Sequence, residues 1–480
     1  MKHLRLSILS LILFTVLFSC EEKEGHPNIV VILCDDLGYG DLSSFGHPVI
    51  ETPNLDQLAA DGIKFTSFYS AAPVCSPSRA GLLTGRSPNR AGIYDFIPSP
   101  KRSEDCRDLV HLQAHEQTIP AMLKQVGYAT CLSGKWHCSS KFNSDAQPTP
   151  DHFGFDHWFA THNNASPSHE HPNNFVRNGE KVGEIEGYSC QIVVNEALQW
   201  LDSKATDQPF YLQVTFHEPH EPVASPQNLV DKYLPKSENE NQAKYFANVE
   251  NIDQAVGRLV EYLKEKHGEN TLIIFSSDNG PETLDRHPRA FRSYGSPGEL
   301  RGMKLWTTEA GFRVPGILHW MGKSTFTGTS DAIVSSLDFM PTFAELAGAT
   351  LPDRPLDGES ITSLIETGSK KRGKPLTWAF YDAINERRVA MRTDDWKIMA
   401  SLEADTSVMV RLHNIYDGNL DMIKNARLTD FVLFDMKEDI KEATDVSSKY
   451  PKVFEEMEEL LKTEYRALLE GSHVWTRATE

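Results

Sequence analysis

The sequence predicts an α/β fold in which a mostly parallel central sheet is flanked by helices, with a small C-terminal antiparallel sheet plus helix. Three observations predict it: short apolar runs that end in polar residues, amphipathic helical segments between them, and a change of pattern after about residue 375. Continuous apolar strands alternating with helices are typical of parallel sheets covered on both faces. We expect a large domain over residues 26–375 and a C-terminal subdomain over residues 376–480.

The first 20 residues indicate an export signal and not part of the fold. A basic start precedes an apolar run over residues 6–18, which is too short for a permanent membrane helix. The following Leu-Phe-Ser-Cys is similar to a bacterial lipobox, which would lipidate Cys20; ordinary cleavage near Ser19 is the alternative. We predict an exported protein, periplasmic or an outer-membrane lipoprotein, whose membrane contact is only through a lipid anchor.

Four strands are expected to place polar groups at one edge of the central sheet. The apolar runs are 28–34, 128–134, 210–216 and 271–277, and they lead into Asp35, Lys135, His217 and Asp278. In open α/β sheets ligands bind at the carboxyl ends of the strands. The sequence therefore predicts a functional site at that edge.

Helical spacing supports the elements between and after these strands. Residues 243–267 carry apolar side chains at helical intervals, and residues 192–204 form a shorter example. In the C-terminal part, residues 377–381, 388–392, 396–399 and 431–434 are strand-like, and residues 453–469 are helical. We expect these segments to form the antiparallel sheet and its helix.

Charge and cysteine content limit the classes of partner. The net charge of −19 makes nucleic acid an unsuitable partner, because phosphate binding needs a basic surface. An anionic substrate would need a local group of cations. Seven scattered cysteines form no metal-binding pattern, and they leave one or two unassigned disulfides open.

Two acidic pieces predict a metal site. Asp35 and Asp36 end one strand, and Asp278 with Asn279 follows another. Each piece alone is also compatible with a solvated turn. Adjacent buried carboxylates need a cation, and carboxylate and amide oxygens suit calcium or magnesium.

A set of basic side chains accompanies the predicted metal ligands. Each member taken alone fits ordinary surface or loop positions, but together with a metal they would bind a tetrahedral oxyanion. The set is Arg79, Lys135, His137, His220 and Lys304.

Cys75 completes the set of reactive side chains. Pro77 fits the first position of a helix that continues through residues 80–84, so Cys75 would lie at a positive helix N-terminus that favours a thiolate. A thiolate in an exported protein would be open to oxidation. The residue therefore needs a reason to be there.

Several motifs resemble those of the formylglycine-dependent type I sulfatases, which are arylsulfatase-like members of the alkaline phosphatase superfamily, and in particular the bacterial glycan-degrading kind. The resemblance is carried by Cys75-Ser-Pro-Ser-Arg79 with Thr84-Gly85, and it extends over most of the chain through 35–41, 52–56, 134–137, 219–220, 277–280, 301–304 and 313–315. It implies an alkaline-phosphatase-like fold and a sulfuric ester hydrolase activity. Met303 and Leu305 stand where the family often has glycine.

The resemblance also implies roles for the residues. A maturation enzyme would oxidise Cys75 to formylglycine, whose hydrate attacks sulfur, and Arg79 would orient it. One calcium ion would be held by Asp35, Asp36, Cys75, Asp278 and Asn279. Lys135 and Lys304 would hold sulfate oxygens, His137 would assist the nucleophile, and His220 would protonate the leaving oxygen.

The expected substrate is a sulfated sugar of a polysaccharide or glycosaminoglycan, with galacto configuration as our choice. Side chains expected to contact it are Asn164, His169, Arg289 and Arg292. A phosphate or phosphonate ester hydrolase of the same superfamily and an inactive sulfoglycan-binding lipoprotein are the alternatives.

Overall fold

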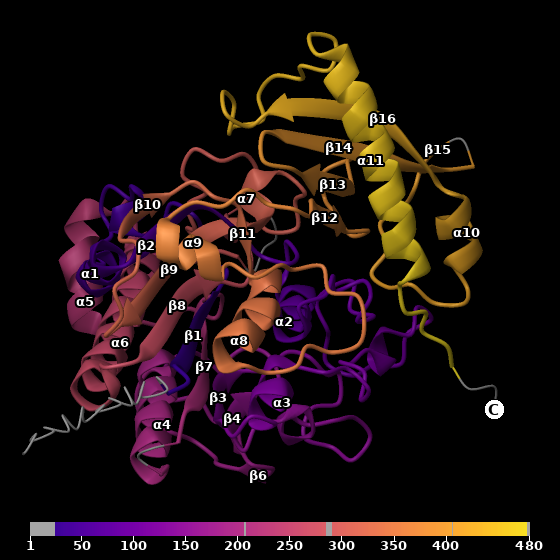
Figure 1. Cartoon of the computed structure of the whole chain (residues 1–480). Coiled ribbons are helices and arrows are strands. Elements are labelled where there is room, and N and C mark those ends of the chain that lie inside the picture. Colours follow the sequence, from indigo (N-terminus) through magenta and orange to yellow (C-terminus); the bar gives the residue numbers. More distant parts are fainter. Residues whose placement is uncertain (1–24, 206–207, 285–289, 406, 478–480) are drawn as a thin grey trace, which may run out of the picture.

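A computed structural model describes residues 25–205, 208–284, 290–405 and 407–477 (Figure 1). An 11-stranded sheet forms its main layer. In spatial order its strands are β10 (Gly328–Ser330), β2 (Ile63–Tyr69), β9 (Arg313–Met321), β8 (Thr271–Ser277), β1 (Asn28–Asp35), β7 (Phe210–Pro219), β3 (Ala129–Lys135), β4 (His157–Thr161), β5 (Val176–Arg177) and β6 (Glu180–Lys181), with β11 (Val334–Ser335) beside β2.

The central five strands of the sheet, β8, β1, β7, β3 and β4, run parallel. Strand β9 is antiparallel to both β8 and β2. Because β8, β1, β7 and β3 point the same way, their carboxyl ends meet at one edge of the sheet. This topology brings together residues that lie more than 200 positions apart in the sequence.

Side chains of β1 alternate between two hydrophobic cores. Ile29, Val31 and Leu33 pack into one core, whereas Val30 and Ile32 pack into the other. Helices α1 (Pro53–Asp61), α4 (Ser189–Ser203), α5 (Gln227–Tyr233) and α6 (Glu240–His267) cover one face of the sheet. Helices α2 (Cys75–Thr84), α3 (Ile119–Lys124), α8 (Phe339–Ala347) and α9 (Thr362–Thr367) belong to the core on the other. The sheet is thus buried on both sides, as its apolar strands predict.

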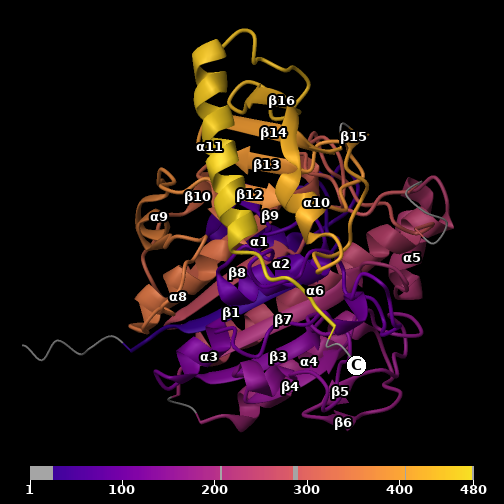
Figure 2. The ribbon, with the colours of Figure 1, turned by 90° about the vertical axis from the view of Figure 1, so that its right-hand side faces the viewer.

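The C-terminal part contains a five-stranded antiparallel sheet (Figure 2). Its strands are β12 (Leu376–Ala379), β13 (Val389–Arg392), β14 (Trp396–Ala404), β15 (Ser407–Val408) and β16 (Arg427–Asp435), with helices α10 (Leu420–Asn425) and α11 (Pro451–Glu470). Helix α11 buries Met457, Leu461, Tyr465 and Leu468, which recur at helical spacing, and it packs on this sheet. One short helix of the main domain, α7 (Glu309–Phe312), lies beside it, and 3-10 turns cover residues 43–45, 107–109, 150–153, 234–236 and 336–338.

The predicted fold class is confirmed, and two details differ. Helix α2 begins at Cys75 itself, so Pro77 is its third residue and not its first; proline is tolerated throughout a first turn because those N–H groups have no helical partner. The open question of disulfides is answered for the described cysteines, Cys34, Cys75, Cys106, Cys131, Cys138 and Cys190, all of which are buried and free.

Some expectations stay outside these observations. The export signal and Cys20 fall in residues 1–24, beyond the part that the structure describes. Within that part, no helix has the length and apolar character needed to cross a membrane. The boundary at residue 375 remains a prediction.

Candidate active site

Three carboxylates meet where β1 and β8 end. Cys34 pairs with Ser277 in the parallel register, so the residues that follow, Asp35 and Asp278, lie side by side. The backbone N–H of Asp278 donates to the Cys34 carbonyl at 3.0 Å, and the N–H of Asp36 donates to Asp278 Oδ1 at 3.3 Å. Asp36 has a φ of 67°, an uncommon left-handed conformation for a residue other than glycine. All three carboxylates are buried.

Three cations from separate elements pair with these carboxylates. The Arg79 guanidinium in α2 lies 2.7 Å from Asp278 Oδ2. Lys135 Nζ, at the end of β3, donates to Asp35 Oδ2 at 2.5 Å. Lys304 Nζ lies 2.8 Å from Asp36 Oδ1, and all three cations are buried. One helix, one strand end and one loop therefore each place a cation against the carboxylates at this edge of the sheet.

These charges act on the pKa of each carboxyl group. Burial alone would raise the pKa of Asp35, but the positive charge of Lys135 holds it well below its usual range. Burial also opposes ionisation of Asp36, and Lys304 keeps its pKa lowered. For Asp278 the effect of burial is larger than that of the Arg79 charge, and the pKa of the carboxyl rises to about 7. Asp35 and Asp36 are thus the firmly ionised members.

The oxygen atoms left without partners fit a divalent cation. Asp35 Oδ1 and Asn279 Oδ1 are buried and accept no hydrogen bond. Asn279 Nδ2 donates to Asp36 Oδ1 at 2.8 Å, so the amide belongs to the same group of side chains. Buried oxygens without a donor are costly, and hard cations such as calcium or magnesium bind oxygens of this type. The predicted ligands Asp35, Asp36, Asp278 and Asn279 therefore fit a metal.

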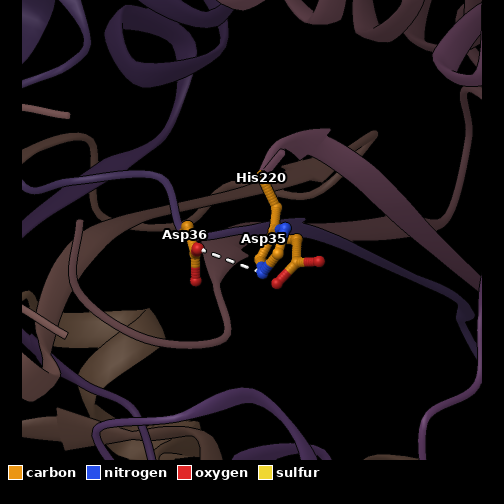
Figure 3. Close-up of side chains that lie close together, drawn as sticks. All are labelled: Asp35, Asp36 and His220. Carbon is orange, nitrogen blue, oxygen red and sulfur yellow. Dashed lines mark ion pairs between the residues drawn. The ribbon is translucent and has the colours of Figure 1, made fainter. Parts of the chain in front are cut away.

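Asp36 also faces a histidine. His220 Nε2 lies 3.6 Å from Asp36 Oδ2, and Asp35, Asp36 and His220 come close enough together to share an ion (Figure 3). His220 Nδ1 is 2.6 Å from the Glu221 carbonyl, which fixes Nδ1 as the donor and leaves Nε2 aimed at Asp36. Burial lowers the pKa of His220 to about 4.

The first helical residue of α2, Cys75, forms part of the cavity wall above these charges. Burial raises the pKa of its thiol to about 11, although Lys135 and Lys304 act in the opposite direction. The expectation of a favoured thiolate at the helix N-terminus is therefore wrong, because Cys75 is only 2% exposed and desolvation outweighs the neighbouring charge. A free Cys75 in this position is a neutral thiol.

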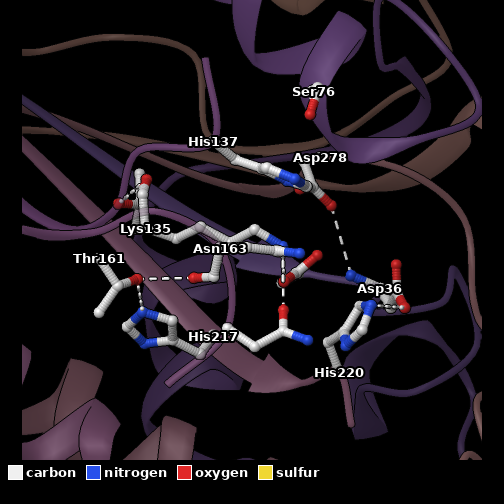
Figure 4. A network of polar contacts seen from close by, with 12 residues as sticks. Asp36, Ser76, Lys135, His137, Thr161, Asn163, His217, His220 and Asp278 are labelled. Atoms are coloured by element: carbon white, nitrogen blue, oxygen red, sulfur yellow. Dashed lines mark hydrogen bonds and ion pairs between the residues drawn. The ribbon is translucent and has the colours of Figure 1, made fainter. Parts of the chain in front are cut away.

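The second histidine of the set, His137, lines the same cavity as Cys75. His137 Nε2 is 3.0 Å from the Ile97 carbonyl, and His137 Nδ1 has no partner. Burial holds the pKa of His137 well below its usual range. Figure 4 shows His137, Lys135, Asp278, Asp36 and His220 within one region of polar contacts.

A cavity of about 480 Å³ opens above these groups. Its lining includes Asp36, Cys75, His137, His220 and Lys304, and a cavity of this size is typical of small-molecule sites. The other predicted residues do not line the cavity but form hydrogen bonds and ion pairs behind its lining: Arg79, Lys135, Asp35, Asp278 and Asn279. The structure thus brings the predicted catalytic and metal residues together.

The predicted substrate contacts divide into three cases. Asn164 and Arg292 line the cavity, and Asn164 Oδ1 accepts from Lys135 Nζ at 3.3 Å. His169 was expected on an open loop but is fully buried, with Nδ1 3.9 Å from Glu218, and it does not line the cavity. His169 is therefore neither a solvated loop residue nor part of the cavity lining. Arg289 lies outside the described residues.

Sequence reasoning did not single out several lining residues. Phe96, Asn163, Glu282, Phe291 and Ser293 belong to this group. No motif or spacing in the sequence distinguishes Phe96, Asn163 and Phe291 from their neighbours. Only the fold shows which loop residues turn inward.

The fold and the site together define a class: an α/β protein with a buried, oxygen-rich and cationic site at the carboxyl edge of its sheet. A family model described as Sulfatase matches residues 27–349. A second model, N-sulphoglucosamine sulphohydrolase, C-terminal, matches residues 302–425. The chain belongs to the sulfatase family.

Curated relatives agree with this assignment. Human N-acetylgalactosamine-6-sulfatase is 34% identical over 360 residues, which cover 71% of this chain and 66% of that protein. Human arylsulfatase A is 33% identical over 422 residues, covering 81% and 78%. The match to the first protein therefore spans just under two thirds of its length.

Solved structures show the same fold. Ps i-CgsB in complex with k-i-k-neocarrahexaose has a TM-score of 0.71 at 28% identity, with 91% of this chain and 93% of that chain covered. The phosphonate monoester hydrolase of Agrobacterium radiobacter has a TM-score of 0.56 at 18% identity, with 92% and 96% covered. At that identity the second likeness concerns the fold alone.

Proposed function

We propose that the protein hydrolyses a sulfate ester on a sulfated sugar, with a formylglycine made from Cys75 as nucleophile and one bound calcium ion. The observation that carries this proposal is the position of Cys75: it shares one cavity wall with Lys304, His137 and His220, directly above the carboxylates. A thiol that stays neutral and buried has little use as a nucleophile. Conversion of Cys75 to formylglycine would place an oxygen nucleophile at this position in the cavity wall.

The metal ligands would be Asp35, Asp36, Asp278 and Asn279, with the modified residue 75 beside them. A calcium ion held there supplies positive charge that neutralises sulfate oxygens. The unpartnered Asp35 Oδ1 and Asn279 Oδ1 support this assignment. Arg79 holds Asp278 in place from α2, the helix that also carries Cys75.

The remaining side chains act on the substrate itself. Lys304 would contact the non-bridging oxygens of the sulfate and neutralise their negative charge, and Lys135, which donates to the cavity-lining Asn164, would add positive charge from behind the lining. His220 would donate a proton from Nε2 to the leaving sugar oxygen, so that no free alkoxide has to form. This role requires the doubly protonated imidazole, because the neutral form with its proton on Nδ1 has none on Nε2; the negative charges of Asp36 and of a bound sulfate favour that form, against burial. His137 accepts a proton on the nucleophile side of the cavity. Each of these roles is a proposal supported by the position of the residue at this cavity.

The substrate we propose is a galacto-configured sulfated sugar of a polysaccharide or glycosaminoglycan. Two comparisons support it: relatives that are N-acetylgalactosamine-6-sulfatases, and the similarity to Ps i-CgsB, solved with k-i-k-neocarrahexaose. We propose further that the chain is exported on a lipid anchor at Cys20, and that a maturation enzyme modifies Cys75.

Mass spectrometry and sulfate release test the function together. The Cys75 peptide from native cells should be about 18 Da lighter than the thiol form. Matured protein should release sulfate from sulfated sugars, and Cys75→Ala should abolish release while Cys131→Ala, a core cysteine of β3, keeps it. A preference for phosphate or phosphonate esters by orders of magnitude would contradict the proposal, and unmodified Cys75 with sugar binding but no turnover would indicate a binding protein.

A further inference from the structure

Two phenylalanines at the cavity are unusually exposed. Phe96 is 39% exposed and Phe291 is 49% exposed. Among all phenylalanine, tyrosine and tryptophan side chains of the described residues, these two alone are classed as exposed, and both line the same cavity as Cys75. Scattered apolar side chains on a surface need no explanation, but the meeting of both exposed aromatic rings at one cavity does.

Phe96 is held firmly relative to the reactive end of the cavity. The carboxylate of the preceding residue, Asp95, is buried and lies 2.9 Å from His413 Nδ1. The following residue, Ile97, donates its N–H to Ser76 Oγ at 2.9 Å and offers its carbonyl to His137. Phe96 is therefore fixed from both sides, by the C-terminal part and by the first turn of α2.

Phe291 is held near the segment that carries His220, through hydrogen bonds of its neighbour Arg292. The N–H of the neighbouring Arg292 donates to Glu221 Oε1 at 2.7 Å, and Arg292 Nη1 donates to the Val223 carbonyl at 2.7 Å. The guanidinium carbon lies 5.0 Å from the centre of the Phe291 ring. The ring is thus connected to a chain segment different from the one that holds Phe96.

The reactive side chains and the two phenylalanine rings lie at different depths in the cavity. Cys75 and Lys304 are 2% and 4% exposed, so they form its inner part, whereas the rings are far more exposed and belong to its outer part. Polar side chains, including Asn163 and Asn164, line the cavity as well. A pyranose unit has hydroxyl groups for such polar partners and an apolar C–H face that an aromatic ring covers well.

We propose that Phe96 and Phe291 form an aromatic subsite for the sugar unit next to the sulfated one. This inference rests on the proposed function and adds the preference that follows from it: a sulfated oligosaccharide binds better than the corresponding sulfated monosaccharide. The inner cations bind the sulfate group, and the two rings bind the apolar face of the neighbouring pyranose.

A binding experiment tests the subsite without any need for turnover. Cys75→Ala protein, which cannot be matured, is titrated calorimetrically with a sulfated galactan tetrasaccharide and with the matching sulfated monosaccharide. Phe96→Ala and Phe291→Ala, added singly, should each weaken tetrasaccharide binding about five- to tenfold, within the range of aromatic contacts. Monosaccharide binding should change less than about twofold, and Phe→Tyr at either position should keep tetrasaccharide affinity.

Leu351→Ala provides the matched control, because Leu351 is 41% exposed and lies outside the cavity lining. It should leave both affinities unchanged. Equal affinity of wild-type and phenylalanine variants for the tetrasaccharide would overturn the subsite, as would equal losses for both sugars. In kinetic assays of the matured enzyme, Phe96→Ala and Phe291→Ala should each show a higher KM for the tetrasaccharide than the wild type, with nearly the same kcat. Failure of the wild type to hydrolyse any sulfate ester would overturn the proposed function instead, and the calorimetric result would still decide the subsite.

Discussion

Arg79 and Asp278 form a buried ion pair beneath the cavity, with Arg79 Nε and Nη2 at 2.9 Å and 2.7 Å from Asp278 Oδ2. The pair joins the helix that carries Cys75 to the strand end that carries the proposed metal ligands. Arg79 also donates to the Lys135 carbonyl at 3.1 Å. One guanidinium therefore connects α2, β8 and β3, the three elements whose relative positions set the geometry of the site.

Removal of Arg79 is expected to reduce stability as well as activity. Arg79→Gln leaves Asp278 buried without its cation. Because the Asp278 carboxyl already has a pKa of about 7, it can take up a proton, so we expect a loss of about 1–3 kcal/mol, the cost of an unsatisfied buried polar group. Urea unfolding of unmatured protein measures this loss. The double variant Arg79→Gln/Asp278→Asn should recover part of the stability but no sulfate release. Arg427→Gln is the control, because its pair with Glu403 is exposed and contributes less than about 1 kcal/mol. Equal stability of Arg79→Gln and wild type would contradict the role of the pair.

Calcium binding should depend on the carboxylates at the strand ends. Asp35→Asn removes an ionised ligand from the proposed site, so we expect calcium affinity to fall by about tenfold or more, since ligand charge sets affinity in such sites. Calorimetric titration of wild-type and variant protein measures the change. Calcium should also raise the Tm of the wild type, and EDTA should reverse this. Asp145→Asn, at an exposed loop position, should bind calcium like the wild type; the same affinity in Asp35→Asn would place the metal elsewhere.

The sequence was informative where the chemistry depends on strand ends. Asp35, Lys135 and Asp278 follow apolar runs, and parallel strands place such residues at a common edge whatever their distance along the chain. Their meeting at one edge therefore follows from the sequence pattern alone. The small antiparallel sheet was predictable on other grounds, because its short strand-like segments follow one another closely after about residue 375.

The remaining parts of the site depend on packing, which a single sequence does not show. The partner of Lys304 is Asp36, 268 residues away, and only the folded loop decides which carboxylate it meets. The thiol of Cys75 was expected to ionise at a helix N-terminus, but its burial reverses the sign of the shift. His169 has the composition of a solvated loop around it and is nevertheless enclosed. The burial of individual side chains outside the strands could not be predicted from the sequence pattern.

The pH dependence of stability should contain a contribution from His413. Hydrogen bonds to Asp382 and Asp95 raise its pKa to about 9, above the ordinary value of about 6.5 that applies to the unfolded chain. The protonated imidazole is therefore favoured by folding. Its contribution is complete below about pH 6.5 and is lost as the pH rises through about 9. Because the side chain is partly exposed, we expect about 1–2 kcal/mol after solvent screening.

Chemical unfolding between pH 6 and pH 10 measures this contribution. In His413→Gln the fall in unfolding free energy over that interval should be smaller than in the wild type by about 1–2 kcal/mol. His115→Gln, at a side chain that is 72% exposed, is the matched histidine control and should follow the wild type. Parallel curves for His413→Gln and wild type would show that the ion pair does not form in solution.

A buried network should connect the C-terminal part to the loop that carries Lys304. Lys397 Nζ on β14 lies 3.0 Å from Glu309 Oε1 and 2.7 Å from Glu442 Oε1, and none of the three side chains is exposed. Glu442 Oε2 accepts the backbone N–H of Glu309 at 2.7 Å, and the Glu442 carbonyl accepts from Arg301 at 2.8 Å. Both ends of residues 301–309 are thereby anchored to the C-terminal part, with Lys304 between them.

Lys397→Met should therefore lower both stability and activity. Two buried carboxylates lose their shared cation, which should cost about 3–5 kcal/mol in unfolding free energy. The loosened loop should misplace Lys304 and lower kcat/KM by about tenfold or more, as small displacements of positioning groups do. Assays well below the Tm of the variant separate the two effects. Lys437→Met, whose 66% exposed side chain pairs with Asp395, should change neither quantity appreciably. A destabilised Lys397→Met enzyme with wild-type kcat/KM would show that the network joins the two parts without positioning Lys304.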